Sequence, residues 1–391
     1  MSPKLHSGLP AILDRVHAIG RDIIAPLADE FDRDARFPDE PFAALKAEKL
    51  LSSYIPTEFG GMGLSICDQA KICEALALYC ASTSMIYAMH QIQIGQIVHH
   101  CMQDDFFRAY MREIVEKQYL IASATTELGV GGDVRSSKCA LSVENGIFSV
   151  EKQAPVISYA IAADAIMVTC RANADAAPSD QKCVLVRKED CTLEEISGWD
   201  TMGFRATCSS GFALRARGDA RQVFPGPYAD IHRKTQQPYS HIVWSATWLG
   251  LAQSAMNNAR ASVRAEARKN PGALPPTALR LAELDSVLFS MRAGVQQCVD
   301  EYHERWLRTD ADAFSDFGFN LRMSNLKVRT SELVIEVVSK ALMICGIAAY
   351  RNDSKLSLNR HLRDAYGPAL MVNNDRILGQ SAQMQIMQRE G

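Results

Sequence analysis

The stretch SVENGIFSV (residues 142–150) decides the fold class, because it marks the point where a helical pattern gives way to strands. Its centre, Asn145-Gly146, is the dipeptide best suited to a two-residue type I′ turn, so the stretch predicts a β-hairpin. Clusters of Pro, Gly, Asp and Ser separate further β-like runs, which occupy residues 165–170, 183–187 and 212–215. No helix of useful length fits between residues 122 and 230, and we therefore expect an antiparallel β domain there.

Helical periodicity governs the chain before the hairpin. An apolar stripe with helical spacing, which Pro26 should bend, runs through Ile12, Val16, Ile19, Ile23, Leu27 and Phe31. The glycines of IPTEFGGMGLS (residues 55–65) then force a loop. Residues 66–115 return to a helical pattern that is rich in Ala, Met and Ile.

Helical periodicity returns after residue 240 and continues to the end of the chain. One stripe comprises Leu281, Leu284, Leu288, Met291, Val295, Cys298, Val299 and Tyr302. Another comprises Leu326, Leu333, Val334, Val337, Val338, Ala341 and Leu342. We expect an α+β protein with an N-terminal helical domain (1–120), a central antiparallel β domain (121–235) and a C-terminal four-helix bundle (236–391). Bundles of this kind often continue across a subunit interface.

Composition excludes several classes of function. The 42 basic and 45 acidic side chains give a formal net charge of −3, so neither a nucleic-acid-binding face nor an acidic tail is indicated. Charged residues interrupt the apolar run near the N-terminus, and no run of eighteen apolar residues occurs, so we expect neither a signal peptide nor a membrane span. The eleven cysteines are scattered without a CxxC pair. This usage is typical of a reduced, cytoplasmic protein whose cysteines pack as small apolar side chains.

Five segments, taken in order, resemble the acyl-CoA dehydrogenase family along nearly the whole chain. IPTEFGGMGLS resembles the family's IPEEYGGLG loop, and ATTELGVGGD (residues 124–133) resembles its TEPGAGSD stretch. WDTMGFRATCS (residues 199–209) is similar to the pattern W-x-x-x-G-x-R-x-T-x-S. ALMICGIAAY (residues 341–350) and RHLRDA (residues 360–365) resemble the paired C-terminal signatures. Each segment alone is a weak signal, but their common order and spacing are specific.

The resemblance implies a cofactor, FAD, held between the β domain and the helices. A flavin ring needs polar donors at its pyrimidine edge and near N5, which strand-end Thr and Ser can supply. The resemblance places such contacts at Thr126 and Ser158, beside Thr125 and Ile157. It also assigns cofactor contacts to Gly131, Gly132 and Asn374, and it places Cys345 and Gly346 against the FAD pyrophosphate of a neighbouring subunit. Arg268 is a further candidate for the pyrophosphate, or else an exposed arginine at a helix end.

The family's catalytic glutamate is missing from both of its usual positions. Acyl-CoA dehydrogenation needs a carboxylate that removes the α-proton of the thioester. Here the two positions hold Val372 and Ser240, and His241 stands where the family usually has Arg. Asp375 is either a relocated base or a solvated carboxylate paired with Arg376. The Trp that covers one face of the flavin is replaced by Val156.

These departures favour the oxygenase branch of the same fold, in which reduced flavin reacts with O₂ and His and Ser near the ring steer protons. His241 and His90 are the candidates, although a single His on a helix is more often a core residue. His99 and His100 are adjacent and point to different faces of a helix, so we expect no metal site.

Three hypotheses follow from the sequence. The first is an FAD-dependent dehydrogenase of an acyl thioester (acyl-CoA or acyl carrier protein) with His241 or Asp375 as a displaced base. The second is a flavin-dependent mono-oxygenase that uses O₂ and a flavin reductase. The third is a non-catalytic FAD-binding homologue. Because the segment with Cys345 and Gly346 should serve the FAD of a neighbouring subunit, we expect a homodimer or homotetramer.

Overall fold

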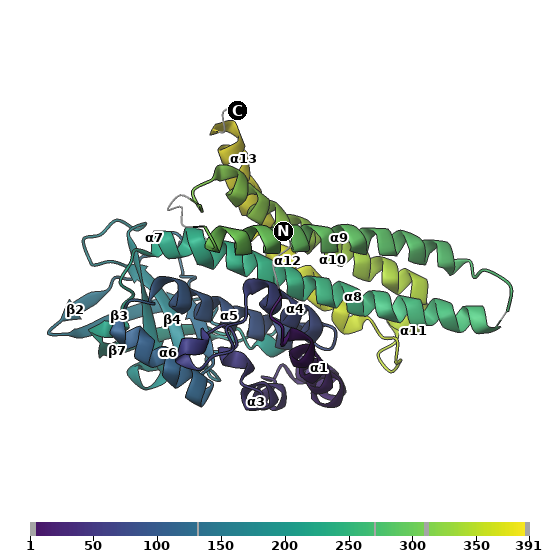
Figure 1. Ribbon diagram of the computed structural model, residues 1–391, viewed down its shortest axis with the longest axis horizontal. Coiled ribbons are helices and arrows are strands. Elements are labelled where there is room, and N and C mark those ends of the chain that lie inside the picture. Colours follow the sequence, from purple (N-terminus) through teal and green to yellow (C-terminus); the bar gives the residue numbers. More distant parts are fainter. Residues whose placement is uncertain (1–4, 131–132, 270, 309–312, 388–391) are drawn as a thin grey trace.

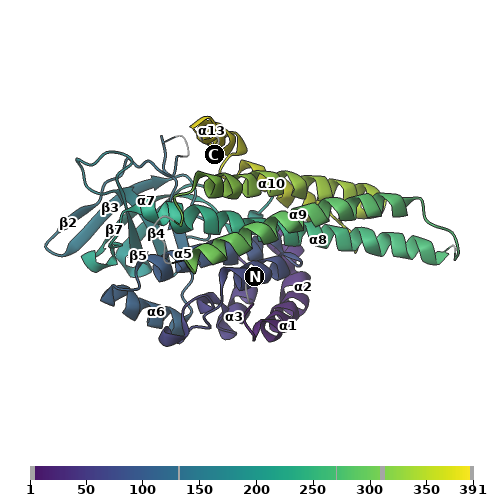
Figure 2. The same cartoon turned by 45° about the horizontal axis from the view of Figure 1, so that its top comes forward.

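The computed structural model describes residues 5–130, 133–269, 271–308 and 313–387. Helices precede and follow a β region, in the predicted order. The β region lies at one end of the molecule, and the long helices α8, α9 and α10 run side by side away from it (Figures 1 and 2). The N-terminal helices pack along the lower side of this bundle in Figure 1.

The N-terminal third is helical. Its α-helices are α1 (Leu9–Ile19), α2 (Ala25–Asp34), α3 (Asp39–Ala47), α4 (Ile66–Ala77), α5 (Ala81–His100) and α6 (Asp105–Lys117). The bend expected at Pro26 is a π-helical turn, Gly20–Ile24, which ends immediately before α2. The loop expected from the glycine-rich segment is confirmed, because Gly60 and Gly63 have φ of 89° and 67°, in the region that glycine adopts without strain.

The middle of the described chain forms two sheets. The strands are β1 (Ile121–Ala124), β2 (Ser142–Glu144), β3 (Ile147–Ala154), β4 (Ala165–Arg171), β5 (Gln181–Arg187), β6 (Cys191–Ser197) and β7 (Gly211–Asp219). Their order is β1-β4-β5 in one sheet and β2-β3-β7-β6 in the other. The hairpin is confirmed: Ser142 pairs with Ser149, and Asn145 and Gly146 both have positive φ, as a type I′ turn requires.

The predicted antiparallel β domain is confirmed with the exception of one pair of strands. β1 runs parallel to β4, with Ile121 opposite Ala165, whereas the other paired strands are antiparallel. β1 enters the sheet directly from α6 and continues into the segment that holds Thr125 and Thr126. The parallel pairing therefore places the end of β1 beside α5 and the helical bundle.

The C-terminal part comprises α7 (Tyr228–Ile231), a π-helical turn (His232–Gln236), α8 (Gln237–Lys269), α9 (Thr277–Trp306), α10 (Phe317–Cys345), α11 (Ile347–Tyr350), α12 (Asn359–Leu370) and α13 (Asn374–Met387). The predicted apolar stripes of α9 and α10 are buried for most of their length. α13 stands away from the bundle in Figure 1. No helix in the described ranges is long and apolar enough to cross a membrane.

At Gly250, α8 lies in tight contact with α4. A Cβ built there would lie 2.3 Å from the carbonyl oxygen of Glu74 and 2.7 Å from the Cβ of Ala77. We predict that Gly250→Ala lowers the free energy of unfolding by about 1–3 kcal/mol, because one of two packed helices must shift. The measurement is denaturant or thermal unfolding of the purified protein.

Gly294 in the middle of α9 provides the matched control. A Cβ there meets no atom within 4 Å. Gly294→Ala should therefore be neutral or stabilise the protein by up to about 1 kcal/mol through helix propensity. Equal effects of the two substitutions would contradict the packing argument.

Candidate functional site

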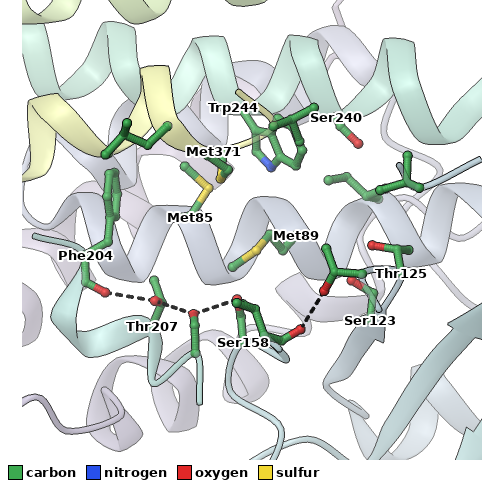
Figure 3. A pocket seen from close by; sticks show the side chains of 18 of the residues that line it. Met85, Met89, Ser123, Thr125, Ser158, Phe204, Thr207, Ser240, Trp244 and Met371 are labelled. Carbon is green, nitrogen blue, oxygen red and sulfur yellow. Dashed lines mark hydrogen bonds between the residues drawn. The ribbon is translucent and has the colours of Figure 1, made fainter. Parts of the chain in front are cut away.

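A cavity of about 610 Å³ lies where α5, the β region, α8 and the α12–α13 segment meet. Its volume is within the range of roughly 300–1,000 Å³ that is usual for small-molecule sites. Much of its wall is apolar (Figure 3), with side chains that include Met85, Met89, Phe204, Trp244 and Met371. Trp199 adds a second indole. Aromatic wall residues are therefore present, although Val156 replaces the expected Trp.

Hydroxyl groups line the side of the cavity formed by the β region. Ser123, Thr125 and Thr126 come from the end of β1, and Ser158 comes from the segment after β3. Thr126 Oγ1 donates a hydrogen bond of 3.2 Å to the carbonyl of Val156. The structure thus brings together three of the residues that the sequence assigned to flavin contacts. Ile157, the residue before Ser158, has a fully buried side chain that packs in the core.

His241 and Ser240 both line the cavity from the N-terminal half of α8. His241 Nδ1 donates a hydrogen bond to the carbonyl of Met323 at 2.9 Å, so in the neutral ring Nε2 carries the lone pair. Burial lowers the pKa of His241 to about 3, which keeps the ring neutral at physiological pH. Ser240 donates its hydroxyl proton to the carbonyl of Gln236, one turn earlier, and does not partner His241.

His90 lies outside the cavity, and its assignment to the catalytic site is not supported. Its Nε2 donates to the carbonyl of Leu51 at 2.8 Å, and its Nδ1 accepts from the backbone N–H of Ile121 at 3.0 Å. Burial lowers the pKa of His90 to about 4. Because both ring nitrogens bond the backbone, His90 joins α5 to β1 and has no nitrogen left for a ligand.

Asp375 does not replace the missing glutamate. It is exposed on the first turn of α13 and is absent from the cavity lining. Its exposure agrees with the alternative of a solvated carboxylate, and Arg376 lines the cavity and pairs with Asp133 at 2.6 Å. Val372, at one of the glutamate positions, lines the cavity with φ of +46°.

Asp133 is the one carboxylate among the described residues that line the cavity. Burial raises its pKa, but the backbone N–H of Arg135 and the charges of Arg376 and Arg135 outweigh burial, so the net shift is downward. Asp133 therefore stays ionised and tied to two guanidinium groups. A carboxylate held in this way is a poor base.

Three further predicted cofactor residues, Cys345, Gly346 and Arg268, lie away from this cavity. Cys345 and Gly346 end α10; Cys345 is buried, and Gly346 is exposed with φ of +63°. Arg268 is exposed on the last turn of α8, a helix that runs away from the β region (Figure 1). Gly131 and Gly132 lie outside the described residues.

Asn374 begins α13 and holds it against α10. Its Oδ1 accepts a hydrogen bond of 2.7 Å from Lys327 Nζ, and its Nδ2 donates a hydrogen bond of 3.0 Å to Ser331 Oγ. Lys327 Nζ also donates to the carbonyl of Val372 at 3.0 Å. Burial lowers the pKa of Lys327 to about 7. Asn374 thus supports the cavity wall from behind and does not line it.

The two adjacent histidines of α5 have separate partners. His99 Nε2 lies 2.6 Å from Tyr54 Oη and its ring stacks on Trp306, while His100 Nε2 bonds Thr235 Oγ1 at 2.8 Å. The described ranges contain no group of three or more His, Cys, Asp or Glu side chains placed to hold a metal ion.

Several residues of the site were missed at the sequence level. Met85 and Met89 lie four residues apart on α5, a spacing that could have identified a helix face toward the cavity. Thr207 and Ser209 also line the cavity. Both belong to the WDTMGFRATCS segment, whose pattern alone predicted no contact for either residue.

Two parts of the chain match the two domain descriptions of one protein family. Residues 9–133 match the description "Acyl-CoA dehydrogenase, N-terminal domain". Residues 238–371 match "Acyl-CoA dehydrogenase, C-terminal domain".

The similar proteins differ in chemistry. Cyclohex-1-ene-1-carbonyl-CoA dehydrogenase of Geobacter metallireducens is 22% identical over 357 residues, which cover 90% of this chain and 91% of that protein. Amino sugar nitrososynthase DnmZ of Streptomyces peucetius is 22% identical over 83% of this chain and 81% of its own. FMN-bound TdsC of Paenibacillus sp. A11-2, a dibenzothiophene monooxygenase, has a TM-score of 0.84 at 16% identity and covers 97% of this chain and 98% of its own. At that identity the structural likeness shows the fold alone.

Buried neutral histidines make the stability of the protein sensitive to acid. Burial lowers the pKa to about 3 for His99, His241 and His361 and to about 4 for His90, His100 and His232. Between pH 6.5 and about 4 the unfolded chain binds protons that the folded chain does not, so the free energy of unfolding falls as pH falls. Each such proton costs up to about 1.4 kcal/mol per pH unit. Asp364, whose pKa burial raises to about 6, offsets part of this loss.

We therefore predict that the thermal midpoint drops steeply from pH 7 to pH 5, before carboxylates with lowered pKa begin to titrate. Unfolding scans across this range measure it. His100→Gln retains an N–H donor for Thr235 and should make the slope shallower by about one proton. A midpoint that stays constant from pH 7 to pH 5 would contradict the assignment of neutral buried rings.

Proposed function

The chain belongs to the acyl-CoA dehydrogenase family of flavin-dependent oxidoreductases, and from this premise we propose that it binds a flavin in the cavity and oxidises a small molecule there. The residues present fit the ring of a flavin. Hydroxyls of Thr125, Thr126 and Ser158 supply polar partners on one side, and Met85, Met89 and Trp244 supply apolar wall. A bound flavin would supply hydride acceptance and, once reduced, electrons for O₂.

We propose FAD as the flavin, with Cys345 and Gly346 serving the cofactor of a neighbouring subunit. The support is the family resemblance of this segment and its place at an exposed end of α10. FMN, which TdsC binds, is the other outcome. Release of the cofactor by denaturation and chromatography of the supernatant distinguishes FAD from FMN.

The observation that favours oxygenation is that none of the described residues lining the cavity is a competent carboxylate base. Asp133 is held by Arg376 and Arg135, and Asp375 is outside the cavity. His241 offers a neutral Nε2, but a group whose pKa is near 3 is a weak base for the α-proton of a thioester. Oxygenation needs no such carboxylate. We therefore propose a flavin-dependent mono-oxygenase as the best-supported function.

In this proposal His241 Nε2 accepts a hydrogen bond from an N–H or O–H group of the substrate. The Met323 carbonyl fixes the ring by holding Nδ1–H, so Nε2 keeps one direction. The apolar wall excludes water and orients the rest of the substrate.

Dehydrogenation of an acyl thioester is the second candidate. The full-length similarity to cyclohex-1-ene-1-carbonyl-CoA dehydrogenase favours it, and His241 would then act as the base. The non-catalytic hypothesis is the outcome if the purified protein binds flavin but reacts neither with acyl thioesters nor, after reduction, with O₂ and a substrate.

We predict that acyl-CoA substrates do not rapidly bleach the flavin of the wild-type protein under anaerobic conditions. A positioned general base commonly contributes about 10²–10⁴-fold in rate, and that contribution is missing. Ser240→Glu should restore bleaching if the cavity accepts a thioester in the family's orientation, because Ser240 faces the cavity from α8. Stopped-flow absorbance of the bound flavin measures both rates.

Ser240→Gln is the matched control, because glutamine has nearly the same shape as glutamate but no charge. The flavin of this variant should not be bleached by acyl-CoA. In whichever reaction gives turnover, His241→Ala should lower the rate far more than Ser240→Ala, because the Ser240 hydroxyl is already bonded to the Gln236 carbonyl. Rapid bleaching of the wild-type flavin by an acyl-CoA would overturn the mono-oxygenase proposal in favour of the dehydrogenase.

We further propose a homodimer or homotetramer built through the C-terminal helices. Large apolar side chains are exposed at the end of α10 and in α11: Met343 (68%), Ile347 (74%) and Tyr350 (70%). Large apolar side chains exposed close together in the sequence favour an interface at this segment. The same segment carries Cys345 and Gly346, so a second copy would bring its cofactor to this surface.

We predict a dimer or tetramer by analytical ultracentrifugation, and dissociation or loss of flavin in Ile347→Glu, which places a charge on this surface. Ile161→Glu is the control, because Ile161 is similarly exposed (66%) but lies in the β region. A monomer that retains flavin would refute this arrangement.

A further inference from the structure

A chain of hydroxyl groups leads from the cavity to a backbone carbonyl. Ser158 Oγ lies 2.7 Å from Ser209 Oγ, and Ser209 Oγ lies 2.7 Å from Thr207 Oγ1. Thr207 Oγ1 lies 2.8 Å from the carbonyl oxygen of Phe204. Figure 3 shows these contacts along the lower wall of the cavity. We refer to Ser158, Ser209 and Thr207 as the hydroxyl chain.

The backbone holds the hydroxyl chain in place. The N–H of Ile157 donates to the carbonyl of Ser210 at 2.9 Å, and the N–H of Tyr159 donates to the carbonyl of Thr207 at 2.8 Å. These bonds align the segment after β3 with residues 207–210 on both sides of Ser158. Thr207 and Ser209 are each only 3% exposed, so water does not compete for their hydrogen bonds.

The carbonyl at the end of the chain determines its direction. A carbonyl oxygen can only accept, so Thr207 must donate its proton to Phe204. Thr207 Oγ1 is then the acceptor for Ser209, and Ser209, whose proton is used, is the acceptor for Ser158. The hydroxyl proton of Ser158 therefore points along the chain, and both of its lone pairs are left to accept. Toward the cavity Ser158 is thus an acceptor and not the donor that the resemblance predicted.

The opposite direction is unfavourable. If Thr207 donated to Ser209, two oxygens would face each other at 2.8 Å with no proton between them. The Phe204 carbonyl cannot move away to relieve this contact, because it also accepts from Trp199 Nε1 and from the backbone N–H of Thr207, each at 3.1 Å. A short contact between unprotonated oxygens in a buried site loses a hydrogen bond and adds repulsion.

We propose that Thr207 and Ser209 are positioning residues that hold Ser158 as a hydrogen-bond acceptor, so that the cavity prefers a ring bearing an N–H donor. This inference rests on the proposed flavin site. The reduced ring of a flavin carries such a donor at N5, whereas the oxidised ring has only a lone pair there. The hydroxyl chain accordingly favours the reduced cofactor, which an oxygenase must retain until O₂ arrives.

One neutral hydrogen bond of this kind changes a binding ratio by about two- to twelvefold. The measured quantity is the ratio of the dissociation constants of the oxidised and reduced flavin, which also follows from the midpoint potential of the bound flavin. Thr207→Val removes the proton that orders the chain, and Ser158 can then donate into the cavity. We expect the preference for reduced flavin to fall by about two- to twelvefold.

Three further variants separate polarity from structure. Thr207→Ser restores the hydroxyl and should restore the wild-type ratio. Ser158→Ala deletes the acceptor without creating a donor, so its effect should be no larger than that of Thr207→Val. Thr83→Val is the matched control, because Thr83 on α5 is fully buried and its Oγ1 has no hydrogen-bond partner among the described residues; it should leave the ratio unchanged.

The outcomes distinguish this inference from the proposed function. Wild-type protein that binds no flavin in either redox state would refute the flavin site itself. Flavin binding with an unchanged or increased preference for the reduced form in Thr207→Val would refute the role of the hydroxyl chain and leave the flavin site standing. If Thr207→Val changes the ratio of dissociation constants but Thr207→Ser does not restore it, the role of the hydroxyl chain is also refuted, because the effect would then come from packing.

Discussion

The burial of the first half of α8 is the constraint on which the site depends. Every side chain from Pro238 to Ala252 is buried, although the helix contains serine, threonine and histidine there. Each buried polar group needs a partner, because an unpaired one costs about 1–3 kcal/mol. Ser245 bonds Thr330 of α10 at 2.8 Å, and Thr247 bonds Ser84 of α5 at 2.9 Å. These bonds fix the rotation of α8 between its neighbours, and the rotation in turn directs His241 at the cavity.

Segments from distant parts of the chain complete the cavity around this helix. The backbone N–H of Phe204 donates to Asp364 of α12 at 2.6 Å, which holds the loop before β7 against the bundle. Arg363 beside it bonds Asp32 of α2, and Arg376 of α13 pairs with Asp133. The cavity is therefore formed by tertiary contacts between the helical and β parts of the fold, and not by any single segment. Its chemistry depends on charges and hydroxyls that are neighbours only in the folded protein.

Sequence patterns predicted the parts of this structure that local physics determines. The Asn145-Gly146 hairpin, the apolar stripes and the glycine loop each follow from a few adjacent residues. β1 was missed because its four residues carry too short a pattern, and β6 because most of its residues are exposed. The strand pairing that joins β1 to β4 spans more than forty residues and has no local signal.

The candidate site shows the same division. Thr125, Thr126, Ser158, Ser240 and His241 were assigned to the site from the sequence, and all line the cavity. His90 and Asp375 were assigned too, but each lies one position along a helix from the residue that does line it, Met89 and Arg376. One residue turns a helix by about 100°, which is enough to move a side chain from a cavity to the core or to solvent.

Two of the polar groups that face the cavity, from opposite parts of the fold, are both hydrogen-bond acceptors. His241 on α8 presents Nε2 as an acceptor because the Met323 carbonyl holds its other proton. Ser158 in the β region presents a lone pair because the Phe204 carbonyl orders the hydroxyl chain. In both cases a backbone carbonyl, which can only accept, fixes where the proton of its partner points. This in turn leaves an acceptor facing the cavity. A cavity with neutral acceptors on two walls stabilises N–H and O–H groups without removing their protons. This is the arrangement expected where reduced flavin and an intact substrate must be held together, and it differs from a dehydrogenase site, where a full negative charge takes a proton from carbon.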